Sequence, residues 1–259
     1  MKSNRCYAFF GLLFPLLLVA ACVRAPAPSL KPVLLNVDLQ PLRDRTAHWG
    51  DYTARFRMRI ENPAGNTRSG ALVIFKGPQP ARFESYTPFG QTVALFVRNE
   101  SESSVLIPSQ KAIFVSKRPE ALIAHFLGID LPLDVFRYSL VGCVPPELVA
   151  DLQVFDEGAV WKASSRSSGQ DRSFVWEFTP GFASLKAAAV TDRRGRYRVE
   201  YDPPVPIAVD STPQRIVFAS PEWRMEIDLE QIRPDPEVSQ EIFRLPPVSG
   251  ARVTSLDQE

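Results

Sequence analysis

Glycine, histidine and cysteine are scarce in this chain, and neither sign of charge prevails. The 259 residues include 13 Gly, 2 His and 3 Cys, which leaves few residues for a glycine-rich phosphate loop, a Cys/His metal cluster or a disulfide framework. The 30 Lys and Arg residues nearly balance 29 Asp and Glu residues, whereas nucleic-acid binding depends on a surplus of cations. We therefore expect no metal, no cofactor and no nucleic-acid partner.

Catalytic groups are equally hard to place. The chain has no Gly-x-Ser-x-Gly motif, and its two histidines, His48 and His125, are far apart in the sequence. Cys143 has no evident base beside it, which favours a buried structural thiol over a nucleophile. The sequence predicts that the protein is not an enzyme.

The first residues have the pattern of an export signal. A short positive start precedes an uncharged stretch from Cys6 to Val23 that ends in small residues, which is typical of a cleaved signal rather than a membrane span. The alternative is an ordinary secretory signal with an incidental cysteine. The end of the stretch, Val19-Ala20-Ala21-Cys22, resembles the bacterial lipobox. The resemblance implies that residues 1–21 are a lipoprotein signal peptide and that Cys22 becomes the acylated N-terminus.

Attachment through Cys22 would place the protein on a membrane without a spanning segment. Several acyl chains on one residue give stable anchoring, whereas one chain holds only marginally. Val23 is not the Asp that retains lipoproteins in the inner membrane of enteric bacteria. The resemblance therefore implies a lipid-anchored, periplasm-facing protein of the outer membrane of a Gram-negative bacterium. Proline-rich residues 22–40 are expected to form a stiff tether.

The body of the chain alternates apolar and polar residues with the period of β-strands. The clearest case is residues 52–61, where apolar side chains alternate with Arg55, Arg57 and Arg59. These arginines could face an acidic partner, although a solvated strand face is the default. Further strands are expected at residues 71–75, 92–97, 105–107, 112–115, 152–155, 159–161, 173–178, 196–201 and 222–229.

Helices are expected in the middle of the chain. Proline near the start and glycine at the end predict helices over residues 118–128 and 132–142, and a weaker pattern covers residues 41–49. We expect one domain over residues 41–232, because no boundary interrupts it. Residues 233–259 are predicted to be a C-terminal extension, either a closing segment or a loosely held tail.

Many antiparallel strands with large side chains on one face tend to curl toward a barrel. The largest rings on that face are Phe174, Trp176 and Phe178, together with Trp223, beside Met225. They could fill a solid core or line an apolar cavity for lipid chains, and the pattern leaves both open.

Residues 82–96 contain a strand, the turn Pro88-Phe89-Gly90 and a second strand, and in this they resemble the LolB family of outer-membrane lipoprotein receptors. The match continues through Pro119-Glu120-Ala121-Leu122, the linker 127–133 and Leu140-Val141-Gly142. The resemblance implies an α+β fold, an incomplete antiparallel β-barrel of about ten to eleven strands with a short helical lid.

The resemblance also implies a function without chemistry. Family members accept acylated lipoproteins from a LolA-like periplasmic carrier and release them into the outer membrane. The turn residues Pro88, Phe89 and Gly90 would be the membrane-insertion loop, since an apolar side chain at its tip cannot reach the core. Phe89 could instead fold back onto a neighbouring strand. The candidate cavity and lid residues are Leu122, Ile123, Phe126, Leu133, Phe136, Phe174, Trp176, Phe178, Trp223 and Met225.

A second function remains open at this point, because fold does not settle function. A lipoprotein with the same fold could bind a lipid or a partner protein as a sensor, a carrier or an envelope assembly factor. No signature of an oligomer is present, so a monomer that contacts membrane lipid is expected.

Overall fold

The computed structural model describes residues 33–167, 171–193, 195–234 and 237–257. The predicted signal peptide, Cys22 and most of the predicted tether lie outside the described residues. In the described part of the chain, no helix is long and apolar enough to cross a membrane.

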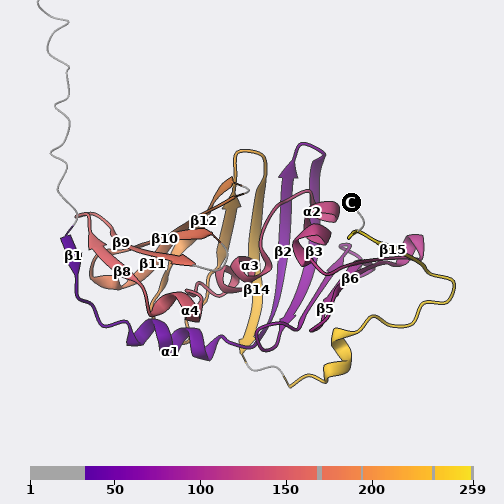
Figure 1. Ribbon diagram of the computed structural model, residues 1–259, viewed down its shortest axis with the longest axis horizontal. Coiled ribbons are helices and arrows are strands. Elements are labelled where there is room, and N and C mark those ends of the chain that lie inside the picture. Colours follow the sequence, from indigo (N-terminus) through magenta and orange to yellow (C-terminus); the bar gives the residue numbers. More distant parts are fainter. Residues whose placement is uncertain (1–32, 168–170, 194, 235–236, 258–259) are drawn as a thin grey trace, which may run out of the picture. The chain divides into compact units, whose positions relative to one another are not determined.

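The described strands form a single sheet with two free edges (Figure 1). Their order across the sheet is β1-β8-β9-β10-β11-β12-β13-β14-β2-β3-β4-β5-β6-β7-β15, and each described neighbouring pair is antiparallel except β7 with β15. The strands are β1 (Val33–Leu35), β2 (Tyr52–Asn62), β3 (Gly65–Phe75), β4 (Ala81–Tyr86), β5 (Thr92–Arg98), β6 (Ser103–Ile107), β7 (Ala112–Ser116), β8 (Gln153–Asp156), β9 (Trp161–Ser167), β10 (Arg172–Phe178), β11 (Ser184–Asp192), β12 (Gly195–Pro206), β13 (Arg215–Ala219), β14 (Arg224–Pro234) and β15 (Arg252–Ser255).

The predicted class, an open antiparallel sheet with few helices, is confirmed. The described residues contain fifteen strands, more than the ten to eleven expected. The additional ones include the short edge strands β1 and β15, and β11, in which Ala187, Ala188 and Ala189 interrupt any alternation. Short strands and uniformly small side chains carry little periodic signal.

The helices pack on the inner face of the curved sheet. They are α1 (Gln40–His48), α2 (Pro119–Leu127), α3 (Leu133–Leu140) and α4 (Pro146–Val149). In Figure 1, α3 lies at the centre, between the β8–β12 part of the sheet and the β2–β6 part. The helices predicted near 41–49, 118–128 and 132–142 are confirmed, whereas the four-residue α4 was not expected.

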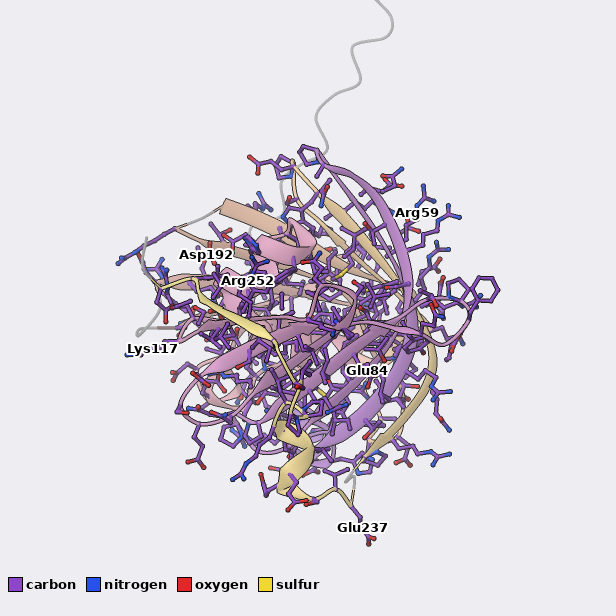
Figure 2. The ribbon with its side chains drawn as sticks, turned by 90° about the vertical axis from the view of Figure 1, so that its right-hand side faces the viewer. Arg59, Glu84, Lys117, Asp192, Glu237 and Arg252 are labelled. Atoms are coloured by element: carbon purple, nitrogen blue, oxygen red, sulfur yellow. The ribbon has the colours of Figure 1, made fainter. Side chains whose placement is uncertain are left out.

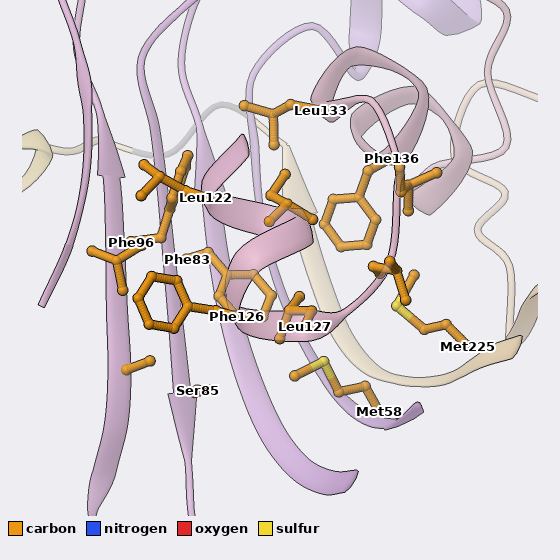
Figure 3. A pocket seen from close by; sticks show the side chains of 15 residues that line it. Met58, Phe83, Ser85, Phe96, Leu122, Phe126, Leu127, Leu133, Phe136 and Met225 are labelled. Atoms are coloured by element: carbon orange, nitrogen blue, oxygen red, sulfur yellow. The ribbon is translucent and has the colours of Figure 1, made fainter. Parts of the chain in front are cut away.

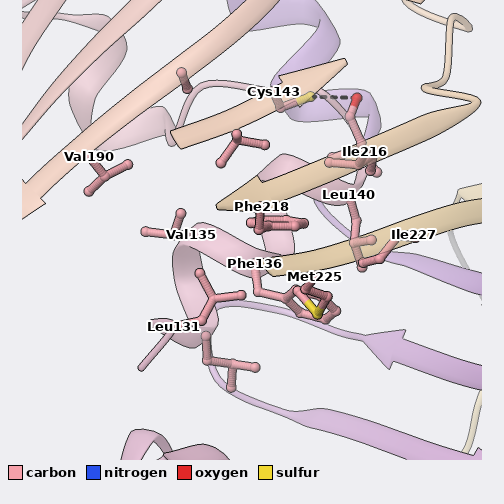
Figure 4. Packing of buried hydrophobic residues seen from close by; sticks show 14 of the residues in the cluster. Leu131, Val135, Phe136, Leu140, Cys143, Val190, Ile216, Phe218, Met225 and Ile227 are labelled. Atoms are coloured by element: carbon pink, nitrogen blue, oxygen red, sulfur yellow. Dashed lines mark hydrogen bonds between the residues drawn. The ribbon is translucent and has the colours of Figure 1, made fainter. Parts of the chain in front are cut away.

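The core lies between the sheet and these helices. Phe136 of α3 is its centre: its ring lies 6.3 Å from that of Phe56, 6.5 Å from that of Phe83 and 6.0 Å from that of Phe218. Figure 4 shows Phe136 beside Phe218 and Met225, which come from β13 and β14. The helix α3 thus joins the two halves of the sheet.

Arg45 of α1 is a fully buried cation in this core. Its Nε donates to the carbonyl of Gly142 at 3.1 Å, one terminal nitrogen donates to Val141 at 2.6 Å, and the other donates to Ala208. One guanidinium therefore satisfies carbonyl groups of two loops that lack a strand partner there.

We expect Arg45→Met to lower the free energy of unfolding by on the order of 3 kcal/mol, because it leaves three carbonyls without a donor. Urea unfolding followed by tryptophan fluorescence measures this. The control is Arg43→Met, since Arg43 is exposed on the same helix. Equal stability of both variants would contradict the assignment.

The segment after β14 packs back on the outer face of the sheet. Phe243 is 2% exposed, and Leu245 and Val248 cover a small apolar cluster of Leu95, Val97 and Leu106. The segment then adds β15 to β7, so the free edge is formed by a strand of only four residues; very short edge strands limit pairing with another chain.

Candidate functional site

An apolar cavity lies between α2, α3 and the β2–β6 part of the sheet (Figure 3). The helices contribute its cover, and the strands contribute its floor. Its lining residues are Met58, Phe83, Ser85, Ala94, Phe96, Val105, Leu122, Ile123, Phe126, Leu127, Ile129, Leu131, Leu133, Phe136 and Met225.

The lining suits a saturated hydrocarbon chain and little else. Ser85 is the one lining residue with a polar side chain. The cavity measures about 80 Å³, which is room for roughly five to eight groups the size of a water molecule or a methylene. This conformation is closed, and a complete acyl chain would need α2 to move outward.

Polar contacts hold the C-terminus of the cover α2 and the residues that directly precede its N-terminus. At its C-terminus, the side-chain amide of Asn62 donates to the carbonyl of Leu127 at 2.8 Å. Gly128 follows with a φ of 63°, and a Cβ there would lie 2.5 Å from the Asn62 amide nitrogen. At the other end, Asp257 accepts from the Ser116 hydroxyl at 2.6 Å and from the backbone N–H of Lys117 at 2.9 Å.

We expect Asn62→Ala to loosen α2 without unfolding the sheet. The variant loses the hydrogen bond to Leu127 and a local one, which the Asn62 side-chain oxygen accepts from the backbone N–H of Ala64 at 2.9 Å. Each is worth about 0.5–1.5 kcal/mol, and only Pro119 and Leu122 of α2 are buried. Amide hydrogen exchange in residues 119–127 should become several-fold faster, whereas exchange in β2 and β14 should stay unchanged. Asn66→Ala is the control, because Asn66 is exposed in the same hairpin. Equally faster amide exchange of α2 in both variants would show that Asn62 does not hold α2 in place.

The turn between β4 and β5 projects an apolar side chain into solvent. Phe89 is 93% exposed. The turn is closed by backbone hydrogen bonds from Thr87 to Gln91 and from Gly90 to Thr87, both 2.9 Å long, and Gly90 has a φ of 80°. Phe89 therefore does not fold back onto a neighbouring strand in this structure.

The structure brings together six of the ten predicted cavity and lid residues. Leu122, Ile123, Phe126, Leu133, Phe136 and Met225 all line the cavity.

The other four predicted residues fill the core elsewhere. Phe174 and Trp176 stack with centroids 5.2 Å apart, Phe178 stacks on Phe182 at 4.1 Å, and Trp223 lies 6.2 Å from Tyr197. None of the four lines the α2 cavity. These rings belong to the half of the sheet that α3 and α4 cover, which explains their close packing.

The sequence analysis did not single out the strand residues of the floor, namely Met58, Phe83, Ser85, Ala94 and Phe96. A usable signal existed, because alternation along 52–61 puts Met58 on the buried face. The pattern does not say which buried residues meet a void.

Cys143 and His125, two of the residues considered for catalysis, pack within the fold. Burial raises the pKa of the Cys143 thiol to about 11, so the thiol stays protonated at neutral pH, and its sulfur lies 3.9 Å from the carbonyls of Arg45 and Val141. His125 packs its ring 5.7 Å from Phe114. Within the described residues, no group of His, Cys, Asp and Glu could hold a metal ion.

The fold and site together define a class of protein, an open antiparallel barrel that encloses an apolar cavity under a helical cover. The family model described as outer membrane lipoprotein LolB matches residues 48–176. The predicted resemblance to this family is thereby confirmed over residues 48–176. They contain the cavity apart from Met225, and also the exposed turn.

Solved structures share the fold at low identity. A putative outer membrane lipoprotein-sorting protein domain from Vibrio parahaemolyticus is 11% identical, with a TM-score of 0.50 over 79% of this chain and 95% of that one. A LolA superfamily protein from Nitrosomonas europaea is 13% identical, with a TM-score of 0.52 over 81% and 99%. A DUF1329 family protein from Desulfovibrio piger is 12% identical, with a TM-score of 0.54 over 81% and 98%. No curated protein matches the chain in sequence.

Proposed function

We propose that this protein is a membrane-anchored lipoprotein receptor. It receives acylated lipoproteins from a LolA-like periplasmic carrier, holds their acyl chains in the α2 cavity and inserts them into the outer membrane. One observation carries the proposal: the β4–β5 hairpin lines the cavity through Phe83, Ala94 and Phe96, and the same hairpin exposes Phe89 at its tip.

This arrangement connects two apolar environments through one element. The inner face of the hairpin contacts a bound chain, and its tip contacts a bilayer. An aromatic side chain suits the membrane interface, where one side is apolar and the other is wet. Release of a chain along β4 and β5 would then keep it away from water over most of its path.

The sequence supplies the anchor for this role. We propose that residues 1–21 are removed, that Cys22 is acylated and that the first part of the predicted tether 22–40, up to β1 at Val33, links the folded domain to the periplasmic side of the outer membrane. Anchoring near the bilayer raises the effective concentration of the Phe89 turn at its surface.

Transfer needs no chemical energy source if each site binds the chains more tightly than the preceding one. Hiding a chain of about sixteen carbons from water is worth on the order of 12 kcal/mol, at about 0.8 kcal/mol per CH₂. Free lipoprotein in water is thus excluded as an intermediate.

The deciding experiment mixes the protein, with residues 1–21 removed and Cys22 replaced by Ala, with a carrier loaded with a labelled lipoprotein. We expect the label to move onto the protein and then into added liposomes. No transfer, with a lipid still co-purifying with the protein, would instead support the sensor or lipid-carrier function.

A further inference from the structure

A polar groove lies on the outer face of the sheet, directly beside the Phe89 turn. It measures about 660 Å³, and Pro88 and Gly90 form one wall. Gly70 brings the turn over this face: a Cβ there would lie 2.1 Å from Cε2 of Tyr86, so only glycine lets the Tyr86 ring lie on the sheet. The charged lining residues are Arg57, Arg59, Arg68, Arg215, Glu226, Asp228 and Glu230.

Cations and anions occupy separate strands of this groove. The register pairs Arg59 of β2 with Arg68 of β3 on one side and with Glu226 of β14 on the other. In the next row, Arg57 is paired with Asp228. Adjacent strands lie about 4.8 Å apart, so the backbone of Arg59 lies one strand spacing from that of Glu226 and the backbone of Arg68 lies two. Arg57 already contacts Glu230, with its Nε 3.0 Å from the carboxylate. Figure 2 shows Arg59 projecting outward from the sheet.

The arginine pair is left partly unsatisfied by the protein itself. Like charges directly opposite each other destabilise a sheet, and Arg59 faces Arg68. Among the described residues Arg68 has no ion-pair partner, and Nε of Arg59 is buried without an acceptor, although the guanidinium reaches Glu61 at 2.5 Å. An anion between the two arginines would satisfy both.

On the carboxylate side, Asp228 has capacity for a cation. Hydrogen bonds from Arg224 and Arg215 hold the pKa of Glu226 below its usual value. Asp228 has only a long contact, 3.7 Å, with Arg215. A purely anionic ligand would meet these carboxylates as well as the arginines, so the groove favours a zwitterion.

We propose that this groove binds the phosphoethanolamine headgroup of a membrane phospholipid. The phosphate lies between Arg59 and Arg68, whose planar guanidinium groups suit phosphate oxygens. The primary ammonium, two carbons away, extends over β2 toward β14 and donates to Asp228 and Glu226. The proposal rests on the proposed function, because entry of Phe89 into the bilayer is what brings the groove to headgroup depth.

The test titrates the full-length protein, kept in an uncharged detergent, with water-soluble glycerophosphoethanolamine and follows binding by calorimetry. We expect saturable binding that is about tenfold weaker for glycerophosphocholine, whose quaternary nitrogen cannot donate hydrogen bonds, and for inorganic phosphate. Arg59→Gln, Arg68→Gln and Asp228→Asn should each weaken binding. Arg55→Gln should not, because Arg55 lies on the same face of β2 but outside the groove.

Absence of saturable binding would overturn the proposal, as would an equal loss in Arg55→Gln. Equal affinity for inorganic phosphate would reduce the groove to a simple anion site and would also overturn it. The result is independent of lipoprotein delivery. Absence of headgroup binding with intact delivery would refute only the proposed headgroup site. Failed delivery with intact headgroup binding would refute only the proposed receptor function.

Discussion

Phe89→Glu is expected to leave acyl-chain uptake from the carrier unchanged and to lower delivery into liposomes by about tenfold or more. The side chain is 93% exposed and lies outside the cavity, so neither the core nor the uptake site changes. Burying a Phe side chain is worth about 1.5–3 kcal/mol, and a carboxylate resists transfer out of water. The measurement is the amount of labelled lipoprotein that floats with vesicles after transfer.

The matched control for this variant is Gln91→Glu, which adds the same charge two positions away at an exposed polar site. It should deliver at nearly the normal rate, and Phe89→Leu should keep most activity because it retains an apolar tip. If Phe89→Glu delivered lipoprotein as the unchanged protein does, the turn would not be an insertion loop.

Ala94→Phe is expected to weaken acyl-chain uptake, lowering the affinity for a fluorescent fatty-acyl probe by about tenfold or more. Ala94 lines the cavity at its floor, and an aromatic ring would occupy most of the roughly 80 Å³ that is empty. Overpacking a core usually costs about 1–3 kcal/mol, so the variant should remain folded. Probe binding and thermal unfolding are measured on the same sample.

Val93→Phe makes the same change on the opposite face of the same strand. Val93 is 46% exposed, because successive side chains of a strand point to opposite faces. This variant should bind the probe normally. If both variants bound it normally, the chains would occupy a site other than the α2 cavity.

The exposure of Phe89 could be predicted from the sequence because it depends on local chain geometry. Proline and glycine on either side of an apolar residue produce a tight turn, and a side chain at such a tip has no strand beneath it. The same holds for β2, whose alternation of apolar and arginine residues predicts which face is buried.

The location of the cavity could not be predicted from the sequence. It depends on Met58 and Met225, which come together only because β14 pairs with β2 across more than 160 residues of chain. Local periodicity assigns a side chain to a face of a strand, but it does not name the neighbouring strand. The large rings around Trp176 were therefore candidates for the cavity, although in the structure they fill the core of the other half of the sheet.

The sequence by itself determined the strand faces, the helix ends and the exposed turn, because each follows from backbone sterics and burial within about ten residues. The tertiary structure decided which apolar residues meet empty space and which arginines face one another on the outer surface. Both depend on strand order and register, which bring together residues far apart in the sequence and therefore do not follow from any local pattern.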